Sequence, residues 1–493
     1  DNTDGFTIDG DGSLTLLSAN EEALDTLSVD ASNASGTVAV GTDGTFNSAV
    51  DLANVTGVDT VTLQGGSGGG AQIDNLESGV GIEVTKADFG NNLTFNNANV
   101  TSLEFEIDGK NFTGNLLDPA NSLETLSINT ANGANDFANS ANILDDSALE
   151  TLNIDSSGTN GNTLNVGSHQ ARQGADPLSV NETDVNITGG NDVNIDALSV
   201  NNNMERFNVA NDGDNTTTVV ALNGGANETL RTTLDGSGDI TISTLTANGT
   251  PGNNTKNVLL TSSGDGAMSV GTVDLQSGAE ATLLRTQGLN DLDLGTGFDL
   301  GDSGDMDLQF RGDGDVTIQS FTACENIAMN NTLAIDSTSS DGSGTNEITN
   351  ASNLSLDSNG ATVEVTGDQD MTIGNSVANG LDVATMDNTV TATIDAGNFS
   401  GDLTLFAQRQ TGGTDGQESE QNISLGSGDD SVTVGSVGGS NNSDFFSFNH
   451  TGSAIGDDDI TNFSTGSADD NDILDFGQIA ANGSAQLNNM SGI

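Results

Sequence analysis

The sequence has few positive charges and no tryptophan or tyrosine. Lysine and arginine number nine against 72 aspartate and glutamate residues, which gives the 493-residue chain a formal net charge of -63. Such a charge excludes nucleic acid and anionic membrane as electrostatic partners. The missing tryptophan and tyrosine remove the platforms on which bases and sugar rings usually stack, which weakens any polysaccharide-binding or polysaccharide-cleaving function.

Cysteine is nearly absent as well. The single cysteine, Cys324, rules out an intramolecular disulfide framework, so stability must have another source. We expect Cys324 to be a packed core thiol, because leucine fills its place in related segments. No apolar run approaches the roughly 18 residues of a membrane span, so we expect no membrane insertion. No export signal is visible, but the sequence starts at Asp1 without methionine, which makes this absence uninformative.

An acidic, aromatic-poor composition is also typical of disordered chains, but the placement of the apolar residues argues against disorder. Hydrophobic residues make up 33% of the chain and lie in short runs that alternate with polar residues, as strands require. The 64 glycines, with many asparagines and aspartates, favour frequent tight turns. Helical signal is confined to a weak capping motif that predicts one turn of helix at Ser18–Leu24.

One short phrase recurs along most of the chain. It reads apolar, acidic, any, apolar, any, apolar, and its alternating end predicts a strand with one face in the core and one in solvent. It occurs at Leu24–Val29, Val58–Leu63, Leu123–Ile128, Leu149–Ile154, Met204–Val209 and Cys324–Met329, with a shorter relative at Leu103–Ile107.

A second phrase places glycine and aspartate just before an alternating apolar triplet, which predicts a turn that leads into a strand. It occurs at Gly189–Ile195, Gly236–Ile242, Gly312–Ile318 and Gly367–Ile373. Many short strands between such turns predict an all-β fold. Repetition favours a β-solenoid, similar to a parallel β-helix, in which coils of ~20 to 30 residues stack to bury a continuous core. A string of β-sandwich modules is the alternative.

The residue composition of the sequence changes near residue 420. We place a domain boundary between Gln408 and Gln421, which gives a solenoid body at residues 1–410 and a C-terminal segment at residues 411–493. This segment contains Gly426–Val434, which fits the calcium nonapeptide: Gly426 and Gly428 shape a turn, and Asp430 offers a carboxylate beside Asp429.

Further aspartates extend the predicted calcium chemistry. Three more acidic turns, each followed by apolar residues, contribute Asp444, Asp457, Asp459 and Asp472. The glycine-aspartate phrases add Asp239, Asp315 and Asp370, where aspartate directly adjoins the apolar residue. At these last three positions, calcium and a plain turn-forming role stay equally open. Bound calcium would also neutralise carboxylates that are too close for monovalent salt to screen.

The segment 423–476 resembles the terminal portion of RTX-type calcium-binding proteins exported by type I secretion. Asp459–Phe463 and Asp472–Phe476 match the two aspartate-phenylalanine phrases that end such proteins. The repeated acidic-threonine phrases and Thr391–Leu405 are similar to segments of RTX-containing bacterial surface-layer proteins. The resemblance implies a secreted β-solenoid with a calcium-binding β-roll segment that assembles into a calcium-dependent lattice on the cell surface.

We therefore expect an extracellular structural protein, not an enzyme, that forms a homo-oligomeric surface layer or filament with calcium. A cell-surface polysaccharide stays open as an anchoring partner. His169 and His450 lie in polar or turn-like settings and are expected at the surface, and the arginines are scattered along the chain. The alternatives are a secreted adhesin or ice-binding solenoid, which regular Thr-x-Thr ladders would favour, and a β-helix polysaccharide lyase.

Overall fold

The structure is a computed structural model. It describes residues 5–18, 21–65, 70–85, 87–96, 99–120, 122–144, 149–170, 181–200, 205–224, 229–247, 256–274, 281–288, 291–295, 298–299, 305–323, 332–339, 344–352, 362–382, 391–410, 420–437, 445–450, 458–461 and 473–474. The chain divides into two compact units. Unit 1 comprises residues 1–225, 230–243 and 264–266, and unit 2 comprises residues 226–229, 244–263 and 267–493.

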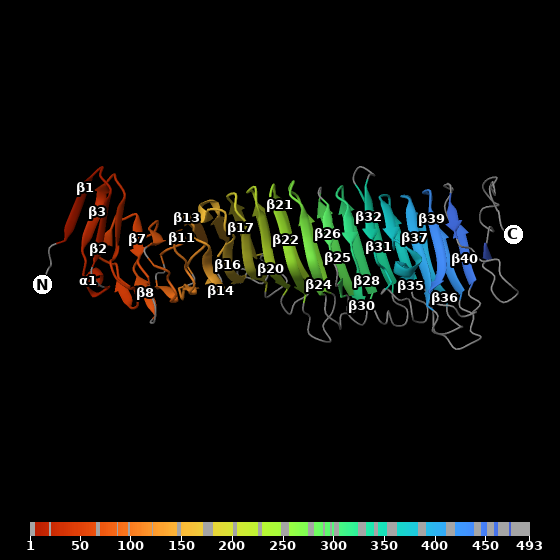
Figure 1. Ribbon diagram of the computed structural model, residues 1–493, viewed down its shortest axis with the longest axis horizontal. Helices are drawn as coiled ribbons and strands as arrows, with labels where there is room; N and C mark the ends of the chain where they lie inside the picture. The colour runs from red at the N-terminus through yellow and green to blue at the C-terminus, as the bar shows by residue number, and fades with distance from the viewer. Residues whose placement is uncertain are drawn as a thin grey trace. The chain divides into compact units, whose positions relative to one another are not determined.

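Unit 1 contains strands of three sheets (Figure 1). Sheet A consists of β1 (Phe6–Gly10), β3 (Val29–Ala34) and β6 (Val55–Thr56). Sheet B contains β2 (Leu14–Ser18), β4 (Val38–Thr42), β7 (Thr60–Leu63), β9 (Gly81–Val84), β11 (Ser102–Asp108), β13 (Thr125–Ala131), β15 (Thr151–Asp155), β17 (Asn181–Thr188) and β19 (Glu205–Asn211). Sheet C contains β5 (Ala49–Asp51), β8 (Ala71–Asp74), β10 (Leu93–Asn96), β12 (Leu116–Leu117), β14 (Asp136–Leu144), β16 (Leu164–Gln170), β18 (Val193–Ser199) and β20 (Thr216–Gly224). Two strands carry residues of both units: β21 (Thr229–Gly236) of sheet B and β22 (Asp239–Ala247) of sheet C.

Unit 2 contains strands of sheets B and C. Its sheet B strands are β23 (Lys256–Ser262), β25 (Ala281–Gly288), β28 (Asp305–Gly312), β31 (Thr332–Thr338), β33 (Thr362–Gly367), β36 (Thr391–Phe399), β38 (Glu420–Leu425), β40 (Phe445–His450) and β42 (Ile473–Leu474). Its sheet C strands are β24 (Met268–Asp274), β26 (Leu292–Leu294), β27 (Phe298–Asp299), β29 (Val316–Ile318), β30 (Phe321–Ala323), β32 (Thr345–Ile348), β34 (Asp370–Ile373), β35 (Leu381–Asp382), β37 (Leu403–Gln410), β39 (Ser431–Val437) and β41 (Asp459–Thr461).

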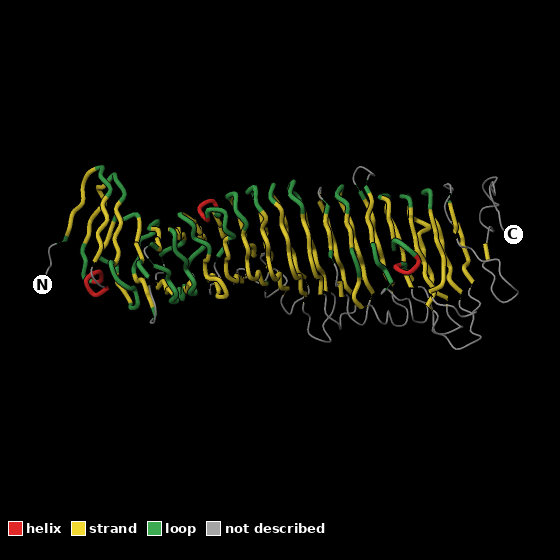
Figure 2. The backbone as a smooth tube through the Cα atoms, in the orientation of Figure 1, coloured by secondary structure: helices red, strands yellow, loops and turns green. Residues whose placement is uncertain are grey.

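Helices are short, as the composition predicts. The helix α1 (Glu21–Asp25) lies where the capping motif predicts a turn of helix. Two single turns of 3-10 helix follow, η1 (Ser157–Thr159) in unit 1 and η2 (Val377–Asn379) in unit 2. The described part of the chain is otherwise strand and turn (Figure 2).

In both units the described strand pairs are parallel and each strand pairs with its equivalent one coil later, so the β-solenoid prediction is confirmed. Ser102 of β11 lies opposite Thr125 of β13, which lies opposite Thr151 of β15. Hydrogen bonds between neighbouring coils join residues that are from 19 to 35 positions apart. Antiparallel sandwich modules, the alternative fold, require hairpin pairing that these registers do not contain.

The two sequence phrases correspond to different sheets. The acidic phrases at Val58–Leu63, Leu123–Ile128, Leu149–Ile154 and Met204–Val209 end in strands of sheet B, whereas Leu24–Val29 leads into sheet A. All four glycine-aspartate phrases lead into sheet C, at β18, β22, β29 and β34. The two phrases thus mark strands of the two main sheets, but in different coils of the solenoid. The phrase at Cys324–Met329, with Cys324, lies outside the described residues.

The core follows from the alternation within each strand. Along β13 the residues Leu126, Ile128 and Thr130 are buried, and the residues between them are partly exposed. In unit 1 a group of buried phenylalanine rings joins neighbouring coils, with centroid separations of 4.9 to 6.5 Å: Phe46, Phe89, Phe105, Phe112 and Phe137. Such offset and edge-on contacts add to the free energy gained by burial.

In unit 2 the strands after residue 420 continue the parallel stack. Strand β38 pairs with β36, and β39 pairs with β37. The proposed domain boundary at residues 408–421 includes residues 411–419, which lie outside the described part of the chain, and it stays a prediction.

Candidate functional site

The candidate site is a row of aspartates where the chain enters sheet C of unit 2. Asp315 directly precedes β29, Asp370 is the first residue of β34, and Asp402 directly precedes β37. If the register of each pair of sheet C strands is continued by one or two residues toward the N-terminus, these aspartates lie opposite one another in successive coils. Thr345 occupies the equivalent position in one of these coils. We call this set the aspartate column: Asp291, Asp315, Asp370, Asp402 and Asp429.

Each carboxylate of the column whose contacts are described accepts a backbone N–H from the next coil. Oδ1 of Asp370 accepts the N–H of Asp402 at 2.8 Å, and Oδ1 of Asp402 accepts the N–H of Asp429 at 2.8 Å. Oδ1 of Asp315 accepts the N–H of Thr345 at 2.7 Å. The aspartate side chain thus serves as a turn-forming acceptor at the start of the strand, one of the two roles that the sequence left open for Asp315 and Asp370.

Asp430 has a different environment from the column. It adjoins Leu403 of the preceding coil, continues the buried face of sheet C, and is 1% exposed. Its Oδ1 accepts the N–H of Leu403 at 3.0 Å and its Oδ2 accepts the N–H of Gly426 at 3.2 Å. A carboxylate therefore fills a place that leucine occupies one coil earlier, and it links two coils through backbone hydrogen bonds.

The charge of Asp430 is poorly compensated. Burial raises the pKa of its carboxyl to about 6, and the nearby carboxylates of Asp458 and Asp402 also raise it. The hydrogen bonds from Leu403 and Gly426 lower the pKa but do not offset the burial. The backbone N–H of Asp430 donates to Oδ1 of Asp458 at 3.2 Å, which places another carboxylate beside the same turn.

The glycines of the turn are explained by close packing between coils. A Cβ on Gly426 would come within 2.0 Å of the carbonyl oxygen of Phe399, and a Cβ on Gly428 would come within 2.1 Å of the carbonyl oxygen of Gly401. Any side chain would therefore push the turn away from the coil before it. Packing against the preceding coil thus explains both glycines, and their role in a calcium nonapeptide stays a prediction.

The remaining predicted ligands are placed as follows. Asp239 begins β22, and its carbonyl oxygen accepts the side-chain N–H of Asn211 at 3.0 Å. Asp459 is exposed at the start of β41, and its N–H donates to the carbonyl oxygen of Asp430 at 2.8 Å. Three predicted ligands lie outside the described residues: Asp444, Asp457 and Asp472.

The turn offers hard oxygen ligands for a cation without forming a complete cage. Within the described residues, no group of three or more histidine, cysteine, aspartate or glutamate side chains is arranged to hold a metal ion. Calcium takes about six to eight oxygens, so a site here would combine Asp429, Asp458 or Asp402 with backbone carbonyls and water. Asp430, with both oxygens already accepting N–H groups, is better placed to organise the turn than to supply most of the coordination.

Sequence reasoning missed part of this arrangement. Asp402 follows glycine and precedes a buried leucine, so it matches the glycine-aspartate phrase and could have been found from the sequence. Asp291 precedes Leu292 in the same way but follows asparagine. Asp458 could not be distinguished by sequence from the aspartates on either side of it.

One sequence prediction was wrong: His169 is not at the surface. It is 2% exposed in β16, on the inner side of the coil, where its ring lies edge-on to Phe207 at 6.2 Å between centroids. Among the described residues neither ring nitrogen has a hydrogen-bond partner. The residues next to His169 in the sequence are polar and suggested exposure. Only the strand register shows that His169 points into the core. The side chain of His450 lies outside the description.

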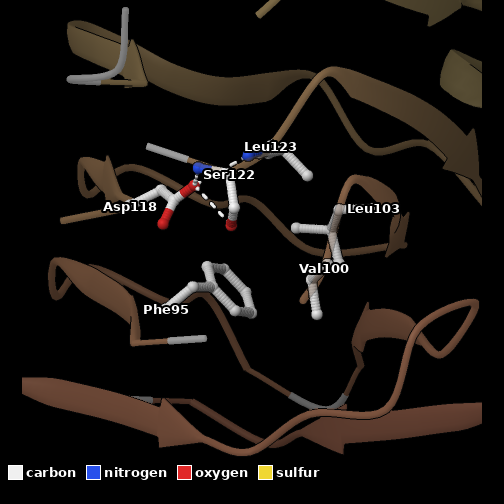
Figure 3. Close-up of a pocket in the computed structure, with 6 residues that line it drawn as sticks. All are labelled: Phe95, Val100, Leu103, Asp118, Ser122 and Leu123. Carbon is white, nitrogen blue, oxygen red and sulfur yellow. Dashed lines mark hydrogen bonds between the residues drawn. The ribbon is translucent and has the colours of Figure 1, made fainter. Parts of the chain in front are cut away.

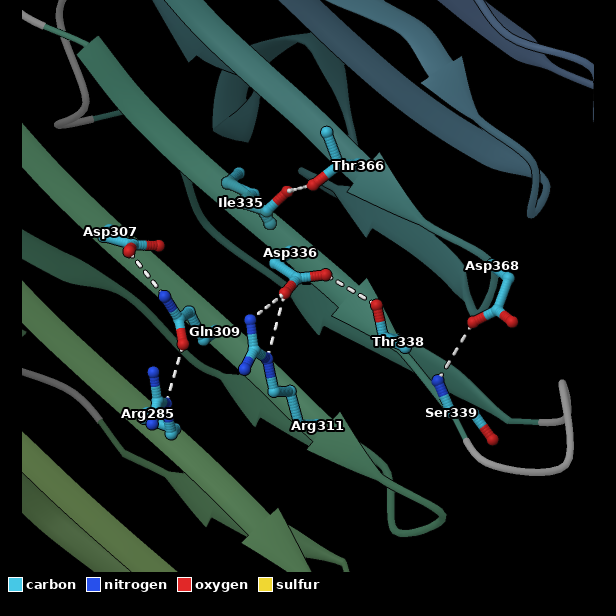
Figure 4. Close-up of polar contacts among 10 residues, drawn as sticks. All are labelled: Arg285, Asp307, Gln309, Arg311, Ile335, Asp336, Thr338, Ser339, Thr366 and Asp368. Carbon is cyan, nitrogen blue, oxygen red and sulfur yellow. Dashed lines mark hydrogen bonds and ion pairs between the residues drawn. The ribbon is translucent and has the colours of Figure 1, made fainter.

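Four of the arginines that look scattered in the sequence lie on strands of sheet B, whereas Arg409 lies on β37 of sheet C. In unit 1, Arg206 of β19 lies opposite Arg231 of β21 and forms an ion pair with Glu182. In unit 2, Arg311 forms an ion pair with Asp336 at 2.7 Å, and Arg285 donates to Gln309 at 2.7 Å (Figure 4). Arg206 and Arg311 thus compensate carboxylates of sheet B, and none of these contacts reaches the aspartate column.

Unit 1 also has a small hollow beside the turn after β12 (Figure 3). Its polar wall is Asp118, whose Oδ2 accepts the N–H groups of Ser122 at 2.8 Å and Leu123 at 2.9 Å. Its other walls are apolar: Phe95, Val100, Leu103 and Leu123. Ser122 also lines the hollow and donates its hydroxyl to the same Oδ2 at 3.3 Å, so the polar groups of the hollow are used to close the turn.

No helix in the described residues is long and apolar enough to cross a membrane. Comparison with protein-family models, with curated proteins and with solved structures gives no match for this chain.

Proposed function

We propose that this protein is an extracellular structural protein that self-assembles, with bound calcium, into a surface layer or surface filament. The observation that carries the proposal is the aspartate column of unit 2 together with the buried carboxylate of Asp430. Neighbouring coils are ~4.8 Å apart, so stacked carboxylates repel one another by about 1 kcal/mol per adjacent pair even at the dielectric constant of water.

The ion pairs of the described residues do not provide the compensation. Only nine lysines and arginines are present, and the described ion pairs of arginine lie on sheet B. Divalent cations bound between carboxylates of one copy, or of two copies, would remove this repulsion and join molecules at the same time. The resemblance to RTX-containing surface-layer proteins supports calcium as the cation and type I secretion as the export route.

A non-enzymatic role agrees with the environment of the described histidine. His169 is enclosed in the core, where no substrate reaches it. The ice-binding alternative gains no support from sheet C, because its stacked solvent-facing positions mix threonine with other residues: Asp293, Thr317, Glu347, Thr372, Thr404 and Ser431.

The test is assembly in calcium and in excess chelator, followed by electron microscopy and light scattering. We expect ordered particles in calcium, their dissolution by chelator and their return when calcium is restored. Replacing Asp402 and Asp429 together by asparagine should raise the calcium concentration needed for assembly by roughly tenfold or more, which corresponds to a loss of about 1.4 kcal/mol or more of binding free energy.

The matched control is the double variant Asp235→Asn with Glu364→Gln, which removes an equal charge from exposed positions on β21 and β33. It should leave the calcium requirement almost unchanged. Particles that persist in chelator, or folded assembled protein that contains no divalent metal by elemental analysis, would refute the proposal.

A further inference from the structure

His169 occupies a position of sheet C that leucine occupies in the neighbouring coils. The register places it opposite Leu144 of β14 and Leu198 of β18, and Leu198 lies opposite Leu222 of β20. His169, Leu198 and Leu222 are 2%, 0% and 1% exposed. An imidazole and a leucine side chain are similar in size, so volume does not explain the exchange. What histidine adds at this position is the ability to bind a proton near neutral pH.

The surroundings of His169 do not compensate a positive charge. Its ring lies edge-on to Phe207 of β19, and within the described residues neither ring nitrogen has a hydrogen-bond partner. The charged residues of the strands packed against it lie at partly exposed outer positions: Asp136, Asp196 and Arg206. The side chain of Glu205 on β19 is outside the description. An imidazolium at this position would therefore be a buried charge without a partner, which is strongly unfavourable.

The boundary between the coils of β14 and β16 is weakly closed. Four residues of β14 pair with β16, and the register shifts on both sides of Asn142. On its other side, the described register joins β14 to β12 through one pair, Leu116 with Leu144. Ala138 of β14 has a φ of +52°, which is strained for a residue with a Cβ. Opening at this boundary therefore breaks few ladder hydrogen bonds and relieves strain.

We propose that His169 makes this boundary a seam that acid opens: when the imidazole binds a proton, the end of β16 separates from β14 and carries the ring into water, while the rest of unit 1 stays folded. His169 is the sixth of the seven residues of β16, so the movement involves only the last part of one strand. The proton binds to the ring nitrogen of the open form, and closing expels it again. The device requires neither calcium nor assembly, so it stands apart from the proposed function.

The direction of the effect follows from the protonation of the two forms. Burial lowers the pKa of His169 to about 4 in the closed form, whereas the ordinary value of 6.5 applies once the ring reaches water. The open form thus binds the proton more readily, so its population should rise as the pH falls from about 6.5 to about 4. Between pH 7 and pH 5 the expected rise is about 20-fold.

The test is native-state amide hydrogen exchange of the full chain between pH 7 and pH 5, with rates corrected for the intrinsic effect of pH. Protection of the amides at the end of β16 should fall by about 20-fold. It should also stay below the protection of β4, which pairs with β2 and β7, at every pH. Low concentrations of urea should hardly change it, because a local opening exposes little surface.

Two variants separate titration from polarity. His169→Gln keeps a polar side chain that does not titrate, so protection at the end of β16 should no longer depend on pH. His169→Leu restores the residue of the neighbouring coils, so it should remove the pH dependence and also raise protection at pH 5.

Two results would overturn the seam. The first is an equal fall of protection with pH in the wild type and in His169→Gln. The second is exchange at the end of β16 that matches β4 in protection and in urea dependence, because only unfolding of the whole of unit 1 would then expose His169. This second comparison uses the wild type alone, so it decides the question even if a variant does not fold.

Discussion

At the scale of single residues, position in the strand register decides what a polar side chain does. Asp429 and Asp430 are adjacent in the sequence, yet Asp429 is exposed and Asp430 is 1% exposed between two coils. The first belongs to a column of turn-forming acceptors, and the second links coils through Leu403 and Gly426. The nonapeptide pattern therefore combines two roles that differ in burial.

His169 gives the first prediction at this scale. Burial lowers the pKa of its imidazole from 6.5 to about 4. Because the unfolded chain binds the proton more readily, the free energy of unfolding of unit 1 should fall as the pH drops from about 6.5 to 4, by on the order of 3 kcal/mol. His169→Leu should remove this part of the pH dependence, as measured by denaturant unfolding at several pH values.

The comparison between the two proteins isolates the histidine. Carboxylates titrate over the same range in both, so only the difference between wild type and His169→Leu reports on position 169. Parallel pH profiles for the two proteins would show that the imidazole finds a partner or solvent in solution.

At the scale of elements, each coil is built from a sheet B strand, a turn and a sheet C strand that are held to the previous coil at fixed register. In some turns a carbonyl oxygen of the previous coil lies so close to the backbone that there is no room for a Cβ. Only glycine fits at these positions. At Gly367 the constraint is doubled, because its φ of +115° also favours glycine.

The prediction at this scale concerns Gly428→Ala. Its Cβ would meet the carbonyl oxygen of Gly401 at 2.1 Å, so the turn must move away from the coil before it. We expect the free energy of unfolding of unit 2 to fall by about 1 to 3 kcal/mol. Gly190→Ala is the control, because a Cβ there meets nothing within 4 Å and Gly190 also precedes a sheet C strand. Equal effects of the two substitutions in chemical denaturation would contradict the packing explanation.

At the scale of the whole molecule, the dominant quantity is the net charge of -63. Parallel stacking places equivalent residues of successive coils one above another, so a repeated aspartate becomes a row of like charges. Hydrogen bonds from backbone N–H groups stabilise each carboxylate locally but do not remove its charge. Counterions must do so, and the row favours ions that contact two carboxylates at once.

The prediction at this scale is a difference between cations of unequal charge. Calcium should raise the melting temperature of the protein more than sodium at equal ionic strength, because a cation bound only to the folded state stabilises it by about 2.7 kcal/mol at a hundredfold excess over its Kd. Differential scanning calorimetry in the two salts measures the effect. Identical melting temperatures would mean that screening alone neutralises the aspartate column.

The sequence by itself determined the class of architecture. Alternating strands, glycine-rich turns and recurring phrases were sufficient to predict a parallel solenoid, because each phrase encodes its own strand and turn locally. They were even sufficient to separate two kinds of strand, which the structure assigns to sheets B and C. The calcium sites, the export route and the assembly stay predictions, since no local contact within the described residues completes a metal cage.

Only the tertiary structure decided which residues share a column. Coils vary in length, so residues such as Asp370, Asp402 and Asp429 are unevenly spaced along the chain and become neighbours only once the register is fixed. The same register turned His169 inward, brought Arg206 opposite Arg231 and placed Phe6 opposite Val29. Burial depends on what lies on the next coil, and that information is distributed over residues some 20 to 35 positions away.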